Sequence, residues 1–282
     1  MSHPDFPVID AHVHLYPDAI ASKVTPALAA RFGNPPSFDG TIEGCRAKDA
    51  SASICASINL PVATKPDSVA HTNDFWAYSN SRNSGVHPAV ISLACFHPLV
   101  QEKGREIERI AALGFRGVKF HPEYQDFRFN DPQMDEAWSA MSELGLVAYL
   151  HAGGERVFKP PYHSTPSEIA LLARRFPKLT IVAAHLGGFG MWDEAEEVLV
   201  GTRVNLDLSH TFFWMSDEQI FRMIKRHGKE RILFGTDAPW QDPEKVLEAF
   251  LALPLDDSER RAICCDNAKR IMNYELREGK RG

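Results

Sequence analysis

The sequence predicts a parallel α/β fold, specifically a single (β/α)8 TIM-type barrel domain that spans residues 1–282. Two observations predict it. Eight short apolar runs alternate with amphipathic stretches, and polar residues suited to catalysis follow five of those runs. Each helical crossover returns the chain to the same edge of the sheet, so the strands are parallel. Their ends converge on one mouth in a closed barrel, whereas in an open doubly wound sheet, the alternative, they spread along a line.

The expected strands are the short apolar runs. They cover residues 8–10, 53–60, 89–96, 115–120, 146–150, 179–184, 203–208 and 231–235. The expected helices between them include residues 73–84, 102–112, 132–144, 167–176, 192–200 and 217–227.

Several of these helices carry recognisable ends. A side chain that can accept a hydrogen bond from the first turn precedes three of them, at Asp131, Thr165 and Ser216. A glycine, which adopts the left-handed conformation at little cost, follows three expected helices, at Gly114, Gly145 and Gly228. The alternation of helix and strand therefore rests on local signals as well as on periodicity.

One long excursion, residues 16–48, follows the first strand. The Asn-Pro-Pro-Ser run at residues 34–37 marks it as a loop, so we expect a long loop insertion after strand one. Loops at this end of barrel strands lie over the mouth, where they help to form the substrate pocket.

Composition argues against several functions. The formal net charge of −6 offers no basic field to nucleic acid or to an anionic membrane surface. No apolar run approaches the roughly 18 residues that a membrane span requires. The five cysteines match neither a zinc-knuckle spacing nor a disulfide framework, so we expect a reducing, cytoplasmic compartment.

The motif Asp-Ala-His-Val-His at residues 10–14 closes the first apolar run. Side chains alternate along a strand, so His12 and His14 point the same way and form half of a tetrahedral metal site. Three later runs also end in a side chain able to bind a metal: His151, His185 and Asp237. Three strand ends carry histidine and a fourth carries aspartate, and this set of side chains predicts a metalloenzyme.

Five segments together resemble the amidohydrolase superfamily. They are Asp-Ala-His-Val-His at 10–14, His151, Ala-His-Leu-Gly-Gly at 184–188, Phe-Gly-Thr-Asp-Ala-Pro-Trp at 234–240 and Asp-Asn-Ala-Lys-Arg at 266–270. More narrowly, the chain resembles the amidohydrolase-2 branch, which includes metal-dependent hydrolases and nonoxidative decarboxylases. The resemblance covers essentially the whole chain and keeps the order of the motifs.

The resemblance implies roles for individual residues. His12, His14 and His151 would bind a divalent metal, and Asp237 would bind it and also handle a proton. His185 would either bind a second metal or polarise the substrate and activate water. Imidazole and carboxylate ligands suit Zn²⁺, with Mn²⁺ and Fe²⁺ as alternatives.

Lys119 decides between one metal and two. In binuclear members a lysine at this position is carboxylated and bridges two ions; in mononuclear members it is not a ligand. A cationic Lys119 would instead bind a substrate carboxylate together with His121, and a bond to a neighbouring carboxylate of the barrel is the structural alternative. We expect one metal, with Lys119 and His121 binding an anionic group of the substrate.

Aromatic residues also follow two of the strands. Trp240 is expected to line the substrate pocket, although packing explains such a position equally well. His210 and the aromatic residues 212–214 would form either an apolar wall of the pocket or a buried loop cluster.

The leading hypothesis is a metal-dependent hydrolase of a small, carboxylate-bearing organic substrate, in which metal-activated water cleaves an amide, lactone or other ester bond. A nonoxidative metal-dependent decarboxylase would use the same site. The family's decarboxylases often replace one histidine of the first motif by Glu, so His12 and His14 favour hydrolysis mildly. A noncatalytic binding barrel is the third alternative. The expected partner is a small-molecule substrate, with no nucleic acid and no membrane, and a homo-oligomer is left open.

Overall fold

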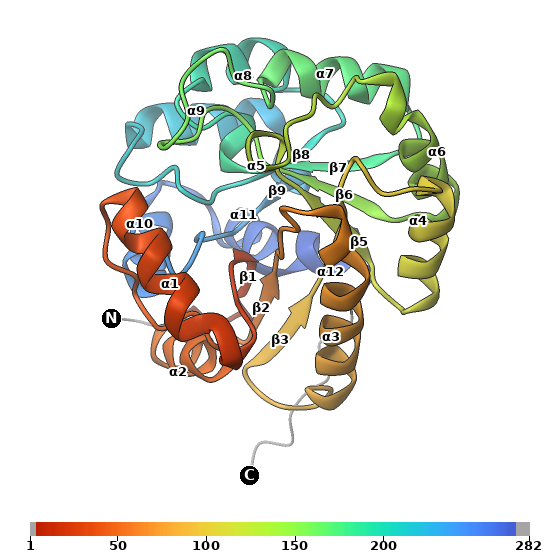
Figure 1. Cartoon of the computed structure of the whole chain (residues 1–282). Helices are drawn as coiled ribbons and strands as arrows, with labels where there is room; N and C mark the ends of the chain where they lie inside the picture. The colour runs from red at the N-terminus through yellow and green to blue at the C-terminus, as the bar shows by residue number, and fades with distance from the viewer. Residues whose placement is uncertain (1–3, 275–282) are drawn as a thin grey trace. The chain divides into compact units, whose positions relative to one another are not determined.

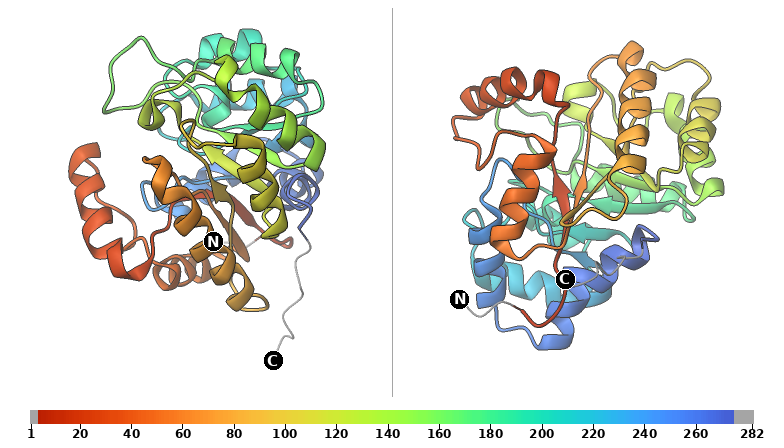
Figure 2. Two further views of the ribbon diagram at one scale, coloured as in Figure 1. Left: turned by 45° about the vertical axis from the view of Figure 1, so that its right-hand side comes forward. Right: turned by 90° about the horizontal axis from the view of Figure 1, so that it is seen from below.

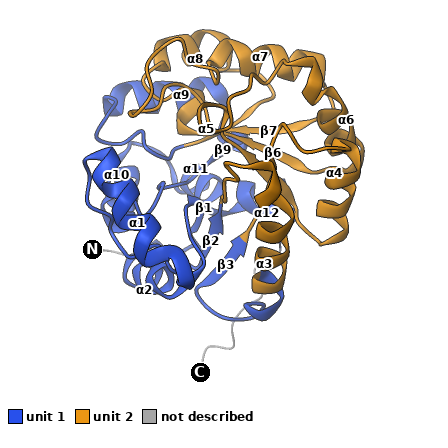
Figure 3. Ribbon diagram, in the orientation of Figure 1, with its two compact units in different colours: residues 1–59, 80–91, 208–282 blue, residues 60–79, 92–207 orange. Residues whose placement is uncertain are grey.

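The computed structural model describes residues 4–274, which form two compact units (Figure 3). Unit 1 contains the described residues of 1–59, 80–91 and 208–282, and unit 2 contains residues 60–79 and 92–207. The predicted single domain over residues 1–282 stays a prediction. No helix in the described part of the chain is long and apolar enough to cross a membrane.

Unit 1 contains the strands β1, β2, β3 and β9. Their bounds are Ile9–Val13, Ala56–Asn59, Ala89–Ser92 (with Ser92 counted in unit 2) and Ile232–Leu233. The order β1-β2-β3 forms one sheet, in which β1 and β2 are parallel. On the other side of β1, the Ala11 N–H donates to Phe234 O at 2.9 Å, and Val13 forms a parallel bridge with Ala238. The end of β1 therefore lies beside the segment that follows β9.

The helices of unit 1 surround these strands. They are α1 (Asp18–Phe32), α2 (Ile42–Ala52), α9 (Asp217–His227), η4 (Lys229–Arg231), α10 (Pro243–Ala252), α11 (Asp257–Arg261), η5 (Ala262–Asp266) and α12 (Asn267–Ile271). Helix α10 packs against α2, and η5 packs against both β1 and β9. Figure 2 shows α1, in red, at the margin of unit 1 in both views.

The predicted loop insertion after strand one is largely helical, which corrects our expectation. The excursion contains α1 and the first turns of α2; apart from residues 16–17, its irregular part is residues 33–41. Pro26 lies inside α1, where proline ordinarily breaks a helix, whereas the five alanines of α1 favour one. The irregular part docks after β9: the Ser37 N–H donates to Pro239 O at 2.7 Å and Asn34 Nδ2 to Trp240 O at 2.8 Å.

Unit 2 contains the parallel strands β4 to β8 in sequential order. Their bounds are Ala94–Cys95, Gly117–Phe120, Val147–Leu150, Thr180–Ala183 and Asn205–Asp207. The helical segments are η1 (Pro66–Ser68), α3 (Val69–Arg82, its last turn counted in unit 1), α4 (Lys103–Ala112), α5 (Pro122–Gln125), η2 (Pro132–Met134), α6 (Asp135–Leu144), α7 (Pro166–Arg175), η3 (His185–Gly187) and α8 (Trp192–Val198). Helix α4 packs on α6 and α7 on α8, along the outside of the strands (Figure 1).

The predicted alternation is confirmed. Each of the eight expected strands overlaps an observed one; β1 extends three residues beyond the expected end, and the third expected strand is divided into β3 and β4. The side chains of Asp131, Thr165 and Ser216 accept hydrogen bonds from the first turns of η2, α7 and α9. The glycines that follow α4, α6 and α9 have φ between 66° and 94°. Local capping chemistry and apolar periodicity therefore place the strand ends from which the site is built.

Candidate active site

The unit 1 cluster consists of His12, His14 and Asp237. His12 and His14 lie at and just beyond the end of β1, and their Nε2 atoms are 3.2 Å apart. Asp237 follows β9, and its Oδ1 lies 3.4 Å from His12 Nε2 and 3.1 Å from His14 Nε2. Two imidazole nitrogens and one carboxylate oxygen thus converge, as alternation along β1 predicts for the histidines.

Backbone contacts hold the cluster together. The carboxylate of Asp10 accepts hydrogen bonds from the backbone N–H groups of His12 and Thr236, at 3.1 and 2.9 Å. The Asp237 N–H donates to His12 O at 2.8 Å, and Asp237 itself has a left-handed φ of 65°. Burial raises the pKa of Asp10 well above its usual range, even though the hydrogen bond from Thr236 opposes that shift.

Two further side chains contact the cluster from the loop after β8. Ser209 Oγ lies 2.9 Å from His12 Nδ1, and His210 Nδ1 lies 2.8 Å from Asp237 Oδ2. The His210 ring also lies near that of Trp214, with centroids 5.6 Å apart. Of the two readings of this loop, a pocket wall or a buried cluster, neither anticipated that His210 contacts the carboxylate of Asp237.

Asp237 is an ionised carboxylate in this setting. Burial would raise its pKa, but the contacts with His14 and His210 and the nearby His12 outweigh burial and hold the pKa well below its usual range. Its Oδ2 is bonded to His210, whereas its buried Oδ1 accepts no hydrogen bond from any residue within 4–274. A buried carboxylate oxygen without a hydrogen bond is costly unless a cation compensates it.

The unit 1 cluster fits a divalent metal ion. Two ligands on one ion, at bond lengths of roughly 2.0–2.1 Å and angles of about 90–110°, lie about 2.9–3.4 Å apart. The three separations within the cluster are 3.2, 3.4 and 3.1 Å. Two histidines and one carboxylate suit Zn²⁺, Mn²⁺ or Fe²⁺.

The unit 2 cluster consists of Lys119, His121, His151 and His185. His151 follows β6, and its Nδ1 lies 3.2 Å from His185 Nε2. Its other ring nitrogen, Nε2, lies 3.0 Å from the carbonyl oxygen of Gly154. Since a carbonyl only accepts, Nε2 carries the proton and Nδ1 offers its lone pair.

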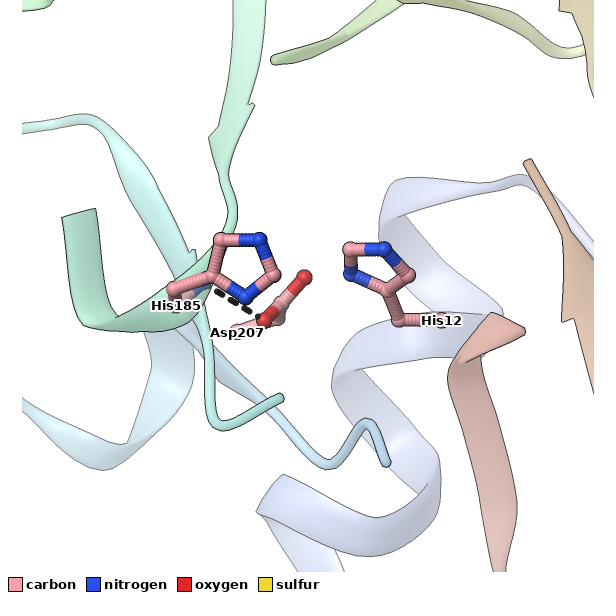
Figure 4. A group of neighbouring side chains, drawn as sticks. All are labelled: His12, His185 and Asp207. Carbon is pink, nitrogen blue, oxygen red and sulfur yellow. Dashed lines mark hydrogen bonds between the residues drawn. The ribbon is translucent and has the colours of Figure 1, made fainter. Parts of the chain in front are cut away.

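His185 is held through its backbone. It has a left-handed φ of 57°, its N–H donates to Asp207 Oδ1 at 3.0 Å, and its carbonyl accepts from Trp192 Nε1 at 2.9 Å. Figure 4 shows the dashed hydrogen bond from His185 to Asp207; His12, also drawn there, belongs to unit 1. Tyr149 Oη donates to the other oxygen of Asp207, which fixes this carboxylate inside unit 2.

Lys119 and His121 lie on and just after β5. The Lys119 side chain is fully buried, with Nζ 5.3 Å from the centroid of the Tyr149 ring. His121 stacks on His151 at a centroid distance of 3.9 Å, and its Nε2 lies 3.6 Å from Glu155 Oε2. Lys119 is the third of the four residues of β5, close to the carboxyl end of the strand, and its role in substrate binding stays a prediction.

Electrostatics distinguish His151 from Asp237. Burial lowers the pKa of His151 well below its usual range, and the neighbouring His121, His185 and Lys119 lower it further. His151 is therefore a neutral imidazole, the form in which histidine binds a metal or accepts a proton.

Trp240 belongs to unit 1 and is almost buried. Its N–H donates to Asp237 O at 2.9 Å, and its ring packs edge-on against Phe32 of α1 with centroids 4.9 Å apart. The backbone hydrogen bond therefore holds Trp240 close to Asp237, while its role as a pocket wall stays a prediction.

The sequence did not single out three residues that contact the two clusters, Glu155, Asp207 and Ser209, and it did not predict the contacts that Asp10 and His210 make. Asp10 and Asp207 carried a signal, because a carboxylate within an apolar strand must find hydrogen-bond donors when it is buried. Glu155, Ser209 and His210 lie in loops, where no periodicity shows which way a side chain points.

Comparison with known proteins identifies the family of the chain. The family model described as Amidohydrolase matches residues 9–273. None of the curated proteins compared with the chain matches it. Among solved structures, 5-carboxyvanillate decarboxylase from Sphingomonas paucimobilis is 18% identical with a TM-score of 0.72, covering 96% of this chain and 100% of that one.

Two further structures are similar at this level. An uncharacterized TIM-barrel protein from Bordetella bronchiseptica is 16% identical with a TM-score of 0.75, covering 95% of this chain and 98% of that one. The 5-carboxyvanillate decarboxylase of Novosphingobium aromaticivorans, which contains bound manganese, is 15% identical with a TM-score of 0.72, covering 96% and 98%. These likenesses confirm the predicted α/β barrel class of the fold. Since the family model spans nearly all of the sequence, the chain belongs to the amidohydrolase family of metal-dependent enzymes.

Proposed function

We propose that the protein is a divalent-metal-dependent hydrolase that cleaves an amide, lactone or other ester bond in a small substrate bearing a carboxylate. The observation that carries the proposal is the convergence of His12, His14 and the ionised Asp237, whose Oδ1 accepts no hydrogen bond among the residues that the structure describes. The family resemblance adds His151 as a fourth ligand. Zn²⁺ is the first expectation, with Mn²⁺ and Fe²⁺ as alternatives.

A bound divalent ion would supply Lewis-acid polarisation of the substrate and acidification of water. Asp237, held as a carboxylate, accepts a proton from the attacking water and returns it to the leaving nitrogen or oxygen. His185, with its backbone fixed by Asp207 and Trp192, is positioned to polarise the scissile carbonyl by a hydrogen bond.

The buried charge of Lys119 supports an anionic substrate. A cation inside unit 2, beside the neutral His151, attracts a carboxylate more strongly than an exposed lysine would. We assign Lys119 and His121 to the substrate's anionic group and propose one metal per chain, with Lys119 uncarboxylated.

Nonoxidative decarboxylation is the second candidate, because two of the similar structures are decarboxylases of an aromatic acid. In that reaction the bond between the ring carbon and the carboxylate breaks, carbon dioxide leaves, and Asp237 or His185 delivers a proton to the carbon. The same residues would serve, so the reaction has to be distinguished by its products.

The test is metal analysis followed by a substrate screen on the metal-loaded protein. We expect one ion per chain, and hydrolysis of lactones or amides that carry a carboxylate. Asp237→Asn should lose activity, while His71→Ala, an exposed histidine on α3, should retain it. Release of carbon dioxide from hydroxybenzoates without hydrolysis would establish the decarboxylase instead. No metal after reconstitution would leave a noncatalytic binding barrel.

A further inference from the structure

The dipeptide Ser209-His210 contacts two different members of the unit 1 cluster. Ser209 Oγ reaches the Nδ1 atom of His12, and His210 Nδ1 reaches the Oδ2 atom of Asp237. Within the cluster, His12 Nε2 faces Asp237 Oδ1. The two contacts from the loop therefore use the other nitrogen of the His12 ring and the other oxygen of the Asp237 carboxylate. One short piece of loop thus supports two residues that the chain separates by more than two hundred positions.

The backbone explains how neighbouring residues reach both targets. The Leu208 N–H donates to Leu233 O at 3.0 Å, which aligns the start of the loop with β9. His210 then adopts a left-handed φ of 54°, and Thr211 Oγ1 donates back to Leu208 O at 2.7 Å. Left-handed conformations are unfavourable for residues other than glycine, so this turn persists only because its contacts stabilise it.

Ser209 Oγ can accept a hydrogen bond from His12 Nδ1, which is the bond that a His12 ring binding a metal through Nε2 would donate. When Nδ1 carries the proton and donates it to Ser209 Oγ, the lone pair of Nε2 faces His14 and Asp237. A histidine that binds a metal through one ring nitrogen ordinarily donates from the other in this way.

The contact with His210 fixes the rotation of the Asp237 carboxylate. Its Oδ2 is occupied by His210, so Oδ1 alone faces the two histidines. Without that contact the carboxylate could turn about its terminal bond, which has a broad, roughly two-fold preference, and the two oxygens would exchange places. The hydrogen bond therefore favours a single oxygen as the ligand.

We propose that Ser209 and His210 are positioning residues of the metal site, which set the tautomer of His12 and the orientation of Asp237. The inference rests on the proposed function, because it assumes that the unit 1 cluster binds a divalent ion. Neither residue supplies a ligand atom to the cluster, and both act through residues that do.

The test compares metal affinity in the full-length protein, measured for Zn²⁺ and Mn²⁺ by competition with a chelator. Changes to partners behind metal ligands typically cost about 10–100-fold in affinity, so Ser209→Ala and His210→Leu should each weaken binding by that order. His210→Asn retains an N–H donor near the position of Nδ1 and should bind the metal close to wild-type affinity. The melting temperature of the metal-free protein is measured for each variant.

Ser216→Ala is the matched control. Ser216 is exposed in the same loop and caps α9 by accepting a hydrogen bond from the Gln219 N–H. Its loss should lower the melting temperature by a few degrees, as loss of a cap does, without changing metal affinity. The control separates destabilisation of the loop from disturbance of the metal site.

The outcomes are distinct. Weak binding in His210→Leu together with recovery in His210→Asn supports the proposal. Wild-type affinity in His210→Leu, or equal weakness in the Leu and Asn variants, overturns it while leaving the proposed function standing. Failure of the wild-type protein to bind either metal overturns both.

Discussion

The unit 1 and unit 2 clusters are both built on histidines at strand ends, but their charges differ. In unit 1, the carboxylate of Asp237 is stabilised in its ionised form beside His12 and His14. In unit 2, burial lowers the pKa of His151 and keeps it neutral, and the neighbouring His121, His185 and Lys119 lower the pKa further. Burial opposes charge in both places, but only at Asp237 do the nearest groups outweigh it.

The difference in charge indicates which kind of ligand each cluster favours. A buried carboxylate oxygen that faces two imidazole nitrogens attracts a cation, whereas a buried lysine attracts an anion. We therefore assign the metal to the unit 1 cluster and the substrate's anionic group to Lys119 and His121 of the unit 2 cluster. Variants that change one charge at a time test this assignment.

The largest effect is expected for Asp237→Asn, which removes the negative charge of the unit 1 cluster. The variant should lose bound metal and lose activity by a factor on the order of 10⁴, the upper range for a general acid–base residue. Metal content by elemental analysis and kcat/KM on the screened substrate measure the two losses. His71→Ala should keep both at wild-type values, and full metal occupancy in Asp237→Asn would break the assignment.

His185→Ala tests whether His185 takes part in metal binding. A residue that only polarises the substrate can be removed without loss of metal, so we expect full metal occupancy and kcat lower by about 10²–10⁴-fold. Elemental analysis and steady-state kinetics on the same preparation decide the question. A loss of metal as complete as in Asp237→Asn would instead make His185 a ligand, either to the same ion or to a second one.

Lys119→Met removes the charge of the unit 2 cluster and keeps a side chain of similar length. Loss of one partner of a buried charge pair costs about 2–5 kcal/mol, so KM for a carboxylate-bearing substrate should rise on the order of 10²-fold or more. A neutral ester of the same substrate should show little change. If metal content falls from two ions per chain in the wild type, Lys119 is a carboxylated bridge and the assignment to substrate is wrong.

The sequence predicted the strand order and most of the strand ends because those features depend on local pattern. Alternation along β1 places His12 and His14 together, and the caps at Thr165 and Ser216 mark where helices begin. These signals act within a few residues, so a single sequence carries them.

The contacts behind the clusters could not be predicted in the same way. His210 stands beside three aromatic residues, which favoured an apolar wall, but its left-handed backbone turns the ring toward Asp237. Asp207 and Glu155 reach their histidines through folding of distant segments. The helix α1 was not predicted, because the Asn-Pro-Pro-Ser run at residues 34–37 marked the whole excursion as a loop. In each case the sequence shows the residue type but not where the side chain points, because that direction depends on contacts with distant segments.

The smallest effect on activity is expected from Asp49→Asn, which changes a buried acid of unit 1 that is not one of the proposed metal ligands. Asp49 on α2 accepts a hydrogen bond from Ser57 Oγ at 2.8 Å and contacts Cys45 Sγ at 3.6 Å. Burial raises its pKa from 3.8 to about 7, against the hydrogen bonds from Ser57 and Cys45 and the charge of Arg46, which lower it. The folded protein therefore binds a proton at Asp49 that the unfolded chain releases at lower pH.

The sign of the stability change follows from this difference. The stabilising contribution of a protonated Asp49 is fully present below pH 3.8 and is lost as pH rises from there to about 7. Asp49→Asn cannot ionise and retains an acceptor for Ser57. Between pH 5 and 8 the free energy of unfolding should therefore fall less in this variant than in the wild type, by a difference of a few kcal/mol. Urea unfolding of the metal-free proteins at both pH values measures it, with the exposed Asp67→Asn as the control. If the free energy of unfolding of Asp49→Asn and of the wild type depended equally on pH, Asp49 would ionise in the folded protein without loss of stability. The nearby polar groups would then govern its charge more than burial does.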